Sequence, residues 1–333
     1  MALKSPLLLS ASYYIIGSMK TKLKTILLPL LTALIWGTAF VAQDVCAESV
    51  PPMAFNALRF AVAVVFLLLV KLVLRLFRRP KADEAPAREG RKGIKTLVIA
   101  GALCGTALAV ASNLQQAGMQ AGTDAGKSGF ITALYVVLVP IGSRLLGKRI
   151  PRMLWAALPI AVTGLYLLCI NGGFSFTPGD LLTFLCAVAF TVQILLIDRF
   201  AGSLDPISFC TAEFLTAAVL SAVGMLVFEG PDWGTVSGFA LPILYVAVFS
   251  CGIAYLLQIV AQRDGDPAIV SLLFSMESVF AVIGGAVILG HRMTAREYIG
   301  CALILAAVII AQIPDRKAPK AQTEDCGSGS DGV

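Results

Sequence analysis

The sequence predicts an all-α polytopic membrane protein in which ten transmembrane helices form two inverted five-helix repeats around a central cavity. Three observations lead to this fold class. Of the 333 residues, 58% are hydrophobic and 14% are charged, and the mean hydropathy is +0.85, far from the averages of soluble domains. The apolar residues gather in runs of about 20, which is the length of a membrane-spanning helix. The second half of the chain also repeats the first.

The apolar runs follow an amino-terminal segment, residues 1–24. Met19 precedes a lysine-rich stretch and then an apolar run, so translation from Met1 or from Met19 and a short interfacial segment are both open at this point. The ten predicted helices cover 25–43, 53–74, 96–119, 125–146, 153–171, 180–198, 206–228, 237–261, 267–289 and 296–313. Apart from a basic loop at 75–95, the connections are short and leave no room for a soluble domain. Residues 314–333 are predicted to be a disordered tail.

The charged residues and the cysteines exclude several classes of protein. A net charge of +6 comes from Lys and Arg residues in the loops, which indicates membrane orientation and not nucleic-acid binding. The eight cysteines contain no Cys-x-x-Cys pair and behave as small apolar residues. His291 is the single histidine. We therefore expect no metal site and no cofactor.

The basic residues also predict how the chain lies in the membrane. With a cytoplasmic amino terminus, the inner side collects Lys20, Lys22 and Lys24, the eight basic residues from Arg75 to Lys95, and those of the tail. The outer loops receive Arg292 and Arg296. By the positive-inside rule, both termini are cytoplasmic in a multi-pass protein of the cytoplasmic membrane.

An internal repeat divides the chain into residues 25–171 and 178–313. A shift of 154 positions matches these residues: Leu31 and Leu185, Ala33 and Ala187, Asp44 and Asp198, Pro52 and Pro206, Phe55 and Phe209, Phe60 and Phe214. A shift of 143 positions matches these: Ala111 and Ala254, Leu114 and Leu257, Gln115 and Gln258, Gly122 and Gly265, Ala125 and Ala268, Ser128 and Ser271, Gly147 and Gly290, Arg149 and Arg292. Since each repeat has an odd number of helices, the second enters the membrane inverted. This architecture suits alternating access, although a duplication kept for stability alone is the alternative.

The run from Gly126 to Pro140 (GKSGFITALYVVLVP), together with the five-plus-five pattern, resembles the EamA-type transporters of the drug/metabolite transporter superfamily. The resemblance covers residues 20–313. Trp36, Pro52, Arg59 and the two Gly-x-Arg turns contribute to it. It implies a ten-helix basket with a central cavity that moves small organic solutes, often outward. Many relatives have Gly-Glu-Arg at the turn, whereas this chain has Lys148 or His291 in the middle, so a role of that glutamate does not transfer.

Glu277 is an acid near the middle of the ninth segment, at the depth where inverted-repeat transporters bind their solutes. The 143-position shift places it opposite Leu134, so it is not part of the duplicated scaffold. The carboxyl either pairs or stays neutral inside the bundle, or it faces a pathway and titrates. We expect the second and assign Glu277 to solute or coupling-ion binding.

Three other charged residues lie inside or at the start of the apolar segments. Arg59 and Glu213 each follow a proline by seven residues in their repeats, about 10 Å along a helix. Because the repeats are inverted, the two side chains point to opposite leaflets, so we expect a gate or structural charges and no direct contact. Lys127 begins the fourth segment three residues after Asp124, where an ion pair, interface exposure or a place at the cavity mouth would each satisfy it.

Polar and aromatic residues inside the segments complete the predicted solute site. The amides could bond a neighbouring helix as readily as a solute, and the aromatic rings could pack or stack on a solute. The candidates are Gln115, Gln258, Gln193, Asn113, Trp36, Tyr135 and Tyr255. Small residues at Gly101 and Gly105 and at Ala281 and Gly285 are interpreted as helix packing.

These observations favour a secondary transporter, an exporter of small organic metabolites or drugs, that acts in the lipid bilayer with a coupled proton or cation. A membrane-embedded enzyme and a scaffold or receptor subunit are the alternatives. The sequence has no His-Glu-x-x-His, no Gly-x-Gly-Asp and no P-loop. Substrate, direction, coupling ion and oligomeric state are left open by the residues.

Overall fold

In the computed structural model, every regular element of the described residues is a helix. The described residues are 6–77, 91–123, 125–170, 177–289 and 293–313. The predicted tail at 314–333, most of the basic loop at 75–95, Asp124 and the turn that holds His291 and Arg292 lie outside them. The predicted all-α fold is confirmed for the part of the chain that the structure describes.

Eight helices within the described residues are long and apolar enough to cross a membrane. They are Lys24–Ala47, Pro52–Phe77, Gly93–Gln120, Lys127–Leu145, Arg152–Cys169, Pro178–Ser203, Pro206–Phe228 and Ala240–Asp264. They correspond to the first eight predicted segments. The ninth segment contains a shorter apolar stretch, Pro267–Ile283, and the tenth is a 17-residue helix, α14 (Ala295–Ala311).

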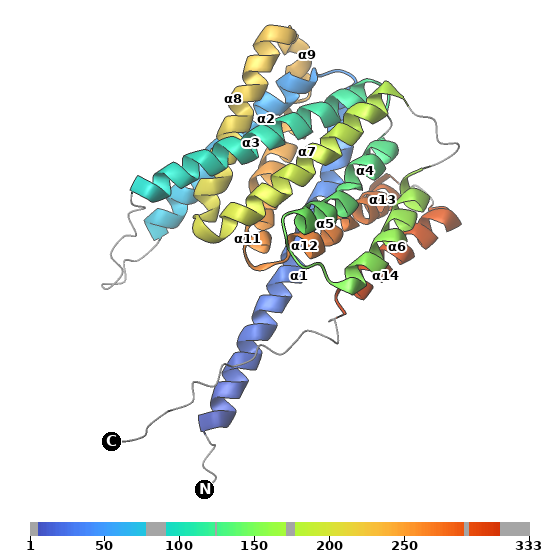
Figure 1. The fold of residues 1–333 in the computed structure, drawn as a ribbon. Coiled ribbons are helices and arrows are strands. Elements are labelled where there is room, and N and C mark those ends of the chain that lie inside the picture. Colours follow the sequence, from blue (N-terminus) through green and yellow to red (C-terminus); the bar gives the residue numbers. More distant parts are fainter. Residues whose placement is uncertain (1–5, 78–90, 124, 171–176, 290–292, 314–333) are drawn as a thin grey trace, which may run out of the picture.

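The first helix is longer than predicted. The helix α1 runs without interruption over 42 residues, Pro6–Ala47, so the backbone of the predicted amino-terminal segment continues directly into the first span. Figure 1 shows its amino-terminal part extending away from the bundle.

Several helices begin where the sequence supplies a cap and a proline. The helices α7 (Pro178–Phe200), α8 (Pro206–Phe228) and α12 (Pro267–Phe274) each have proline in the first turn, where a backbone N–H has no helical partner. The residue before each proline, Thr177, Asp205 or Asp266, accepts a backbone N–H through its side chain. These starts give the second half of the chain well-defined helix boundaries.

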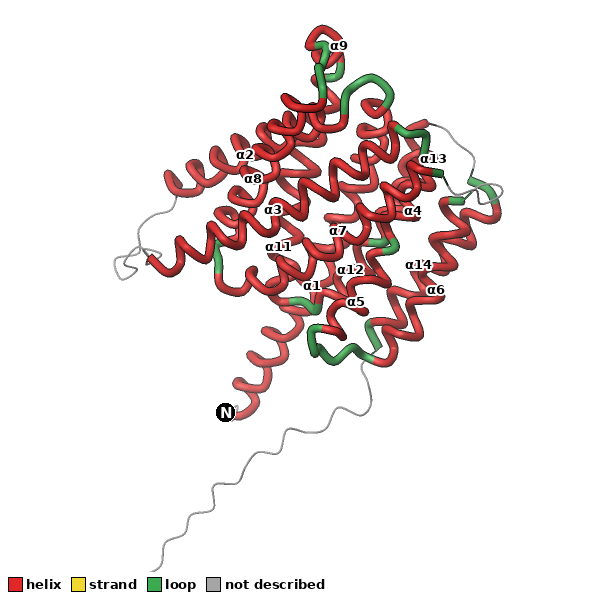
Figure 2. Tube along the Cα trace, turned by 45° about the horizontal axis from the view of Figure 1, so that its top comes forward, coloured by secondary structure: helices red, strands yellow, loops and turns green. Residues whose placement is uncertain are grey.

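The helices pack as a bundle in which distant segments are neighbours (Figures 1 and 2). The helix α6 (Arg152–Cys169) pairs with α14, and α2 (Pro52–Phe77) pairs with α8. The helix α3 (Arg91–Gln120) contacts both α7 and α8, and α1 contacts α13 (Met276–Leu289). Most of the large contacts therefore join the first half of the chain to the second.

Two of the predicted segments are broken helices. The fourth consists of α4 (Ala125–Ala133) and α5 (Tyr135–Leu145), and the ninth consists of α12 and α13. At each break a backbone N–H bonds to the carbonyl three residues back, from Leu134 to Ile131 and from Ser275 to Leu272, which tightens the turn. The Ser275 N–H is shared with the Ser271 carbonyl, four residues back. At the second break the Ser275 hydroxyl also donates to the Leu272 carbonyl, a bond that bends helices. Both segments were predicted from the sequence as continuous helices, and the breaks correct that prediction.

The eighth segment is irregular as well. Between α10 (Ala240–Tyr245) and α11 (Tyr255–Asp264) the chain forms a π-helix, Val246–Ala254. The short α9 (Trp233–Gly238) precedes it and lies at one tip of the bundle in Figure 1. Wide helical turns of this kind often occur at functional sites, and this one contributes Ser250 to the cavity described below.

Two glycines allow helices to approach closely. A Cβ atom on Gly105 would collide with the Glu213 carbonyl on α8 and lie 2.6 Å from Thr216 Cβ. On α1, a Cβ atom on Gly37 would lie 2.6 Å from the Glu277 carbonyl oxygen. The predicted packing role is confirmed for Gly105, and Gly37 brings α1 against the break in the ninth segment.

Candidate functional site

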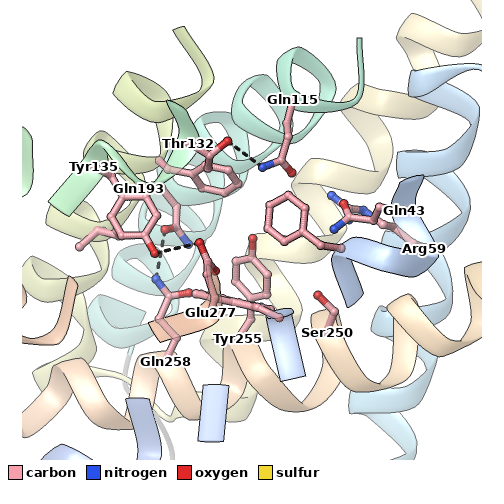
Figure 3. Close-up of a pocket in the computed structure, with 14 residues that line it drawn as sticks. Gln43, Arg59, Gln115, Thr132, Tyr135, Gln193, Ser250, Tyr255, Gln258 and Glu277 are labelled. Carbon is pink, nitrogen blue, oxygen red and sulfur yellow. Dashed lines mark hydrogen bonds between the residues drawn. The ribbon is translucent and has the colours of Figure 1, made fainter. Parts of the chain in front are cut away.

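A cavity of about 50 Å³ lies inside the bundle. Its walls come from α1, α2, α3, α4, α5, α7, the π-helix, α11 and α13 (Figure 3). Both halves of the chain therefore contribute. The lining residues are Trp36, Phe40, Gln43, Arg59, Gln115, Thr132, Tyr135, Phe190, Gln193, Ile194, Ser250, Tyr255, Gln258 and Glu277.

One corner of the cavity is acidic. Glu277 lies in the first turn of α13 and is 4% exposed. The hydroxyl of Tyr135, the first residue of α5, donates to its Oε1 at 3.2 Å. The two helix breaks thus bring Tyr135 and Glu277 together from the fourth and ninth segments. The amino-terminal end of α13 carries a partial positive charge, which favours negative charge at this corner.

Another part of the wall is basic. Arg59 on α2 is 4% exposed, and its Nη1 donates to Gln43 Oε1 at 2.9 Å. The guanidinium carbon lies 5.2 Å from the Phe55 ring centroid and 4.8 Å from that of Phe60, within cation–π range. These contacts hold a full positive charge inside the bundle without an acidic partner in direct contact among the described residues.

A chain of amides connects the cavity with a second acid. Gln258 Nε2 donates to Gln193 Oε1 at 3.2 Å, and Gln193 Nε2 donates to Glu213 Oε1 at 2.8 Å. Glu213, on α8, does not line the cavity. It is fully buried and is separated from the cavity by Gln193 of α7. On another wall, Gln115 Nε2 donates to the Thr132 hydroxyl at 3.1 Å.

Aromatic rings form the apolar surface of the cavity. The Trp36 ring lies 5.0 Å from that of Tyr255 in an edge-on arrangement and 5.1 Å from that of Phe274. Tyr255 also meets Phe214 edge-on at 5.4 Å. A solute in the cavity would therefore contact flat apolar faces between the acidic and basic side chains.

Besides Glu213, two predicted site residues lie away from the cavity. Lys127 Nζ is 2.6 Å from Asp180 Oδ2, so its ion pair links the starts of α4 and α7, whereas the expected partner Asp124 lies outside the described residues. Asn113 has no place in the lining. Its amide nitrogen donates to Ser221 and its oxygen accepts from Asn56, which joins α2, α3 and α8. Both bonds are structural links between helices in this conformation.

Comparisons with known proteins decide the family. The EamA-like transporter family matches the chain twice, at residues 23–170 and 177–312. This chain belongs to the EamA-like transporter family. An uncharacterized transporter of Archaeoglobus fulgidus is 29% identical over 284 residues, with 85% of this chain and 84% of that protein covered. The uncharacterized inner membrane transporter YedA of Escherichia coli K12 is 24% identical, with coverages of 86% and 92%.

The fold of this EamA-like chain also matches a solved structure. A crystal structure aligns with a TM-score of 0.70 at 21% identity and covers 86% of this chain and 96% of its own. Family membership and the apolar helices make the chain a multi-pass membrane protein of a transporter family, as the sequence predicted. They point to transport and away from catalysis.

Several residues that line the cavity of this EamA-like chain are not among those predicted from the sequence. Phe190 lies 154 positions after the predicted residue Trp36, so the repeat shift could have identified it. Phe40 and Ile194 are related by the same shift, but neither was predicted. Gln43 carried a weaker signal, an amide within an apolar run. Thr132 and Ser250 resemble ordinary helix hydroxyls, and their positions depend on the break in the fourth segment and on the π-helix.

Proposed function

We propose that this protein is a secondary transporter that exports small organic solutes across the cytoplasmic membrane by alternating access. One observation carries the proposal. The breaks of the fourth and ninth segments, one from each family repeat, meet at a cavity that is lined by an acid, a base, amides and aromatic rings. Irregular helices that face a polar cavity at the interface of two repeats are characteristic of secondary transporters.

The proposed architecture is the predicted one, ten transmembrane helices in two inverted repeats. The contacts support it, because the helices pair according to a two-fold relation. The second segment (α2) packs on the seventh (α8), and the fifth (α6) packs on the tenth (α14). The third segment (α3) packs on the sixth (α7), and its repeat counterpart, the eighth segment, packs on the first (α1). The lining follows the same relation. Trp36 and Phe190 both line the cavity, as do Gln115 and Gln258.

The positive-inside bias supports an orientation with both termini in the cytoplasm. In that orientation α4 and α7 begin at the outer side, and the ion pair of Lys127 and Asp180 lies at the outer end of the bundle.

We assign roles to the cavity residues by their chemistry. Glu277, held by Tyr135, binds the positive or hydrogen-donating part of the solute or a coupling proton. Arg59, held by Gln43, provides positive charge for an electron-rich part of the solute. Trp36 and Tyr255 supply the flat apolar contact.

Reconstitution tests this function. The purified full-length protein in liposomes is screened against a panel of small organic solutes, with and without a pH gradient. Glu277→Gln keeps the shape of the side chain and removes its charge, so we expect folded protein whose transport no longer responds to pH. Glu48→Gln, at an exposed position after α1, is the matched control and should behave like the wild type.

Two results would contradict the proposal at different levels. No movement of any solute above that of protein-free liposomes would argue against transport. Transport with an unchanged pH response in Glu277→Gln would argue only against its role in coupling, and loss of folded protein would make Glu277 structural.

A further inference from the structure

Glu213 is an acid that the proposed solute site does not use. It lies on α8 and is 0% exposed. Its hydrogen-bond partner is the amide of Gln193 on α7, and the other polar side chains near it, Cys104 on α3, Cys210 on its own helix and Tyr255 on α11, carry no formal charge. Its surroundings therefore contain several polar atoms but lack a contacting cation among the described residues.

Arg59, the charged residue on the neighbouring α2, makes its contacts with residues other than Glu213. Arg59 donates to Gln43 and lies over the rings of Phe55 and Phe60. The ion pairs found among the described residues join Lys71 to Asp205, Lys127 to Asp180 and Lys148 to Asp198. None of these pairs neutralises Glu213.

The hydrogen bonds of Glu213 fit a neutral carboxylic acid. Oε1 accepts one amide N–H from Gln193 at 2.8 Å, as a carbonyl oxygen does. Oε2 is buried without a hydrogen-bond partner in the described structure. A carboxylate with a single amide donor inside an apolar bundle would be strongly destabilised, and addition of a proton to Oε2 removes the charge.

The amide chain joins this acid to the cavity. Gln193 donates to Glu213 and accepts from Gln258, and both glutamines line the cavity (Figure 3). The oxygen Oε1 of Gln258 is buried without a hydrogen-bond partner in the described structure. A solute donor or a water molecule that bonds to this oxygen would therefore change the hydrogen bonds that run from Gln258 through Gln193 to Glu213.

We propose that Glu213 is a second proton-binding site of this protein, behind the solute cavity and joined to it through Gln193 and Gln258. When the cavity hydrates and the two glutamines move, a hydronium ion gives a proton to the Glu213 carboxylate, which forms the O–H bond of Oε2 and leaves a water molecule. The acid stays neutral while the cavity is dry, and at higher pH the proton returns to water when the cavity hydrates again. The site rests on the proposed transport function only for its use in the cycle, since protonation can be measured without transport.

Infrared difference spectroscopy tests the site with the proton as the probe. The full-length protein is reconstituted in phospholipid liposomes, and spectra are recorded across a series of pH steps in H₂O and in D₂O. We expect two carbonyl bands of protonated carboxyl groups that move on deuteration. Glu213→Gln should remove one band and Glu277→Gln the other, while Glu48→Gln keeps both.

Hydrogen-bond variants assign the bands even if Glu213→Gln fails to fold. Gln193→Leu removes the donor to Glu213 Oε1 and should move only the Glu213 band to higher frequency. Tyr135→Phe removes the donor to Glu277 and should move only the other band. Without a substrate, these shifts separate Glu213 from Glu277.

Two outcomes would overturn the inference. Retention of every protonated carboxyl band in Glu213→Gln would show that Glu213 holds no proton. A Glu213 band that responds to neither pH nor deuteration would show a fixed neutral acid and no exchange. Loss of transport with both titrating bands intact would instead contradict the proposed function and leave the site standing.

Discussion

Two matched regions of the repeats differ in their chemistry: the starts of α4 and α7 on one side, and the start of α12 with the part of α1 around Ile26 on the other. At the first location Lys127 contacts Asp180, with side-chain exposures of 12% and 0%. Asp180 also accepts from the Thr123 hydroxyl at 3.0 Å and from the Thr177 backbone N–H at 2.6 Å. At the second location the repeat shifts place Val270 and Ile26, which pack in apolar clusters.

The difference teaches that a duplicated scaffold need not have two equivalent ends. A buried ion pair is costly to break one partner at a time, because it leaves an unpaired charge. Apolar side chains can slide past one another at small cost. The other ion pairs of the described structure are more exposed, with 40% for Lys148 and 50% for Asp205. The Lys127 end should therefore resist separation more strongly than its counterpart.

The largest expected effect comes from breaking the buried pair. Lys127→Met leaves the Asp180 carboxylate buried without its cation and should lower the free energy of unfolding by about 3–5 kcal/mol. Thermal unfolding of the purified protein in detergent measures this loss. The double variant Lys127→Met with Asp180→Asn removes both charges and should recover much of the stability. If the double variant is no more stable than Lys127→Met, the charge argument is wrong.

The two glutamines at matched positions of the repeats, Gln258 and Gln115, should differ in how much stability their loss costs, and both losses should be smaller than that of Lys127→Met. Gln258→Leu leaves the oxygen of Gln193 without its donor, which costs roughly 1–3 kcal/mol for a buried acceptor. In Gln115→Leu, the Thr132 hydroxyl that accepted from Gln115 can bond to its own helix instead, so the loss should stay below about 1 kcal/mol. Unfolding of the two variants under identical conditions gives the comparison. If both variants lose the same free energy of unfolding, the hydrogen bonds from Gln258 through Gln193 to Glu213 do not stabilise the protein more than the bond of Gln115 does.

The fold was predictable because its signals are long and redundant. Runs of about 20 apolar residues located the spans, and pairs such as Asp44 and Asp198 or Gln115 and Gln258 revealed the repeat. The breaks at Leu134 and Ser275 were not predictable. They depend on a few backbone hydrogen bonds within uniformly apolar segments, where composition does not change.

The site was predictable only where one residue stands out from its surroundings. Glu277, Gln193 and Gln258 are polar residues in apolar runs, and the structure brings them to one cavity. Lys127 and Asn113 have the same appearance in the sequence but bond to Asp180 and to Asn56 and Ser221. Which face of a helix a polar residue occupies is decided by packing between distant segments, and a single sequence does not encode that packing in its periodicity.

A small effect is also expected at the apolar counterpart of the ion pair. Val270 is 1% exposed and packs with Val139, Ile194 and Phe274. Val270→Ala removes two methyl groups of packing, about 1–2 kcal/mol by the value of buried CH₂ groups. The measurement is thermal unfolding beside Lys127→Met in the same detergent. Because no charge is left unpaired, the Val270→Ala loss should also stay constant across pH. A loss as large as that of Lys127→Met would mean that the two ends separate at equal cost, and the asymmetry of the repeats would then lie in their residues but not in their energetics.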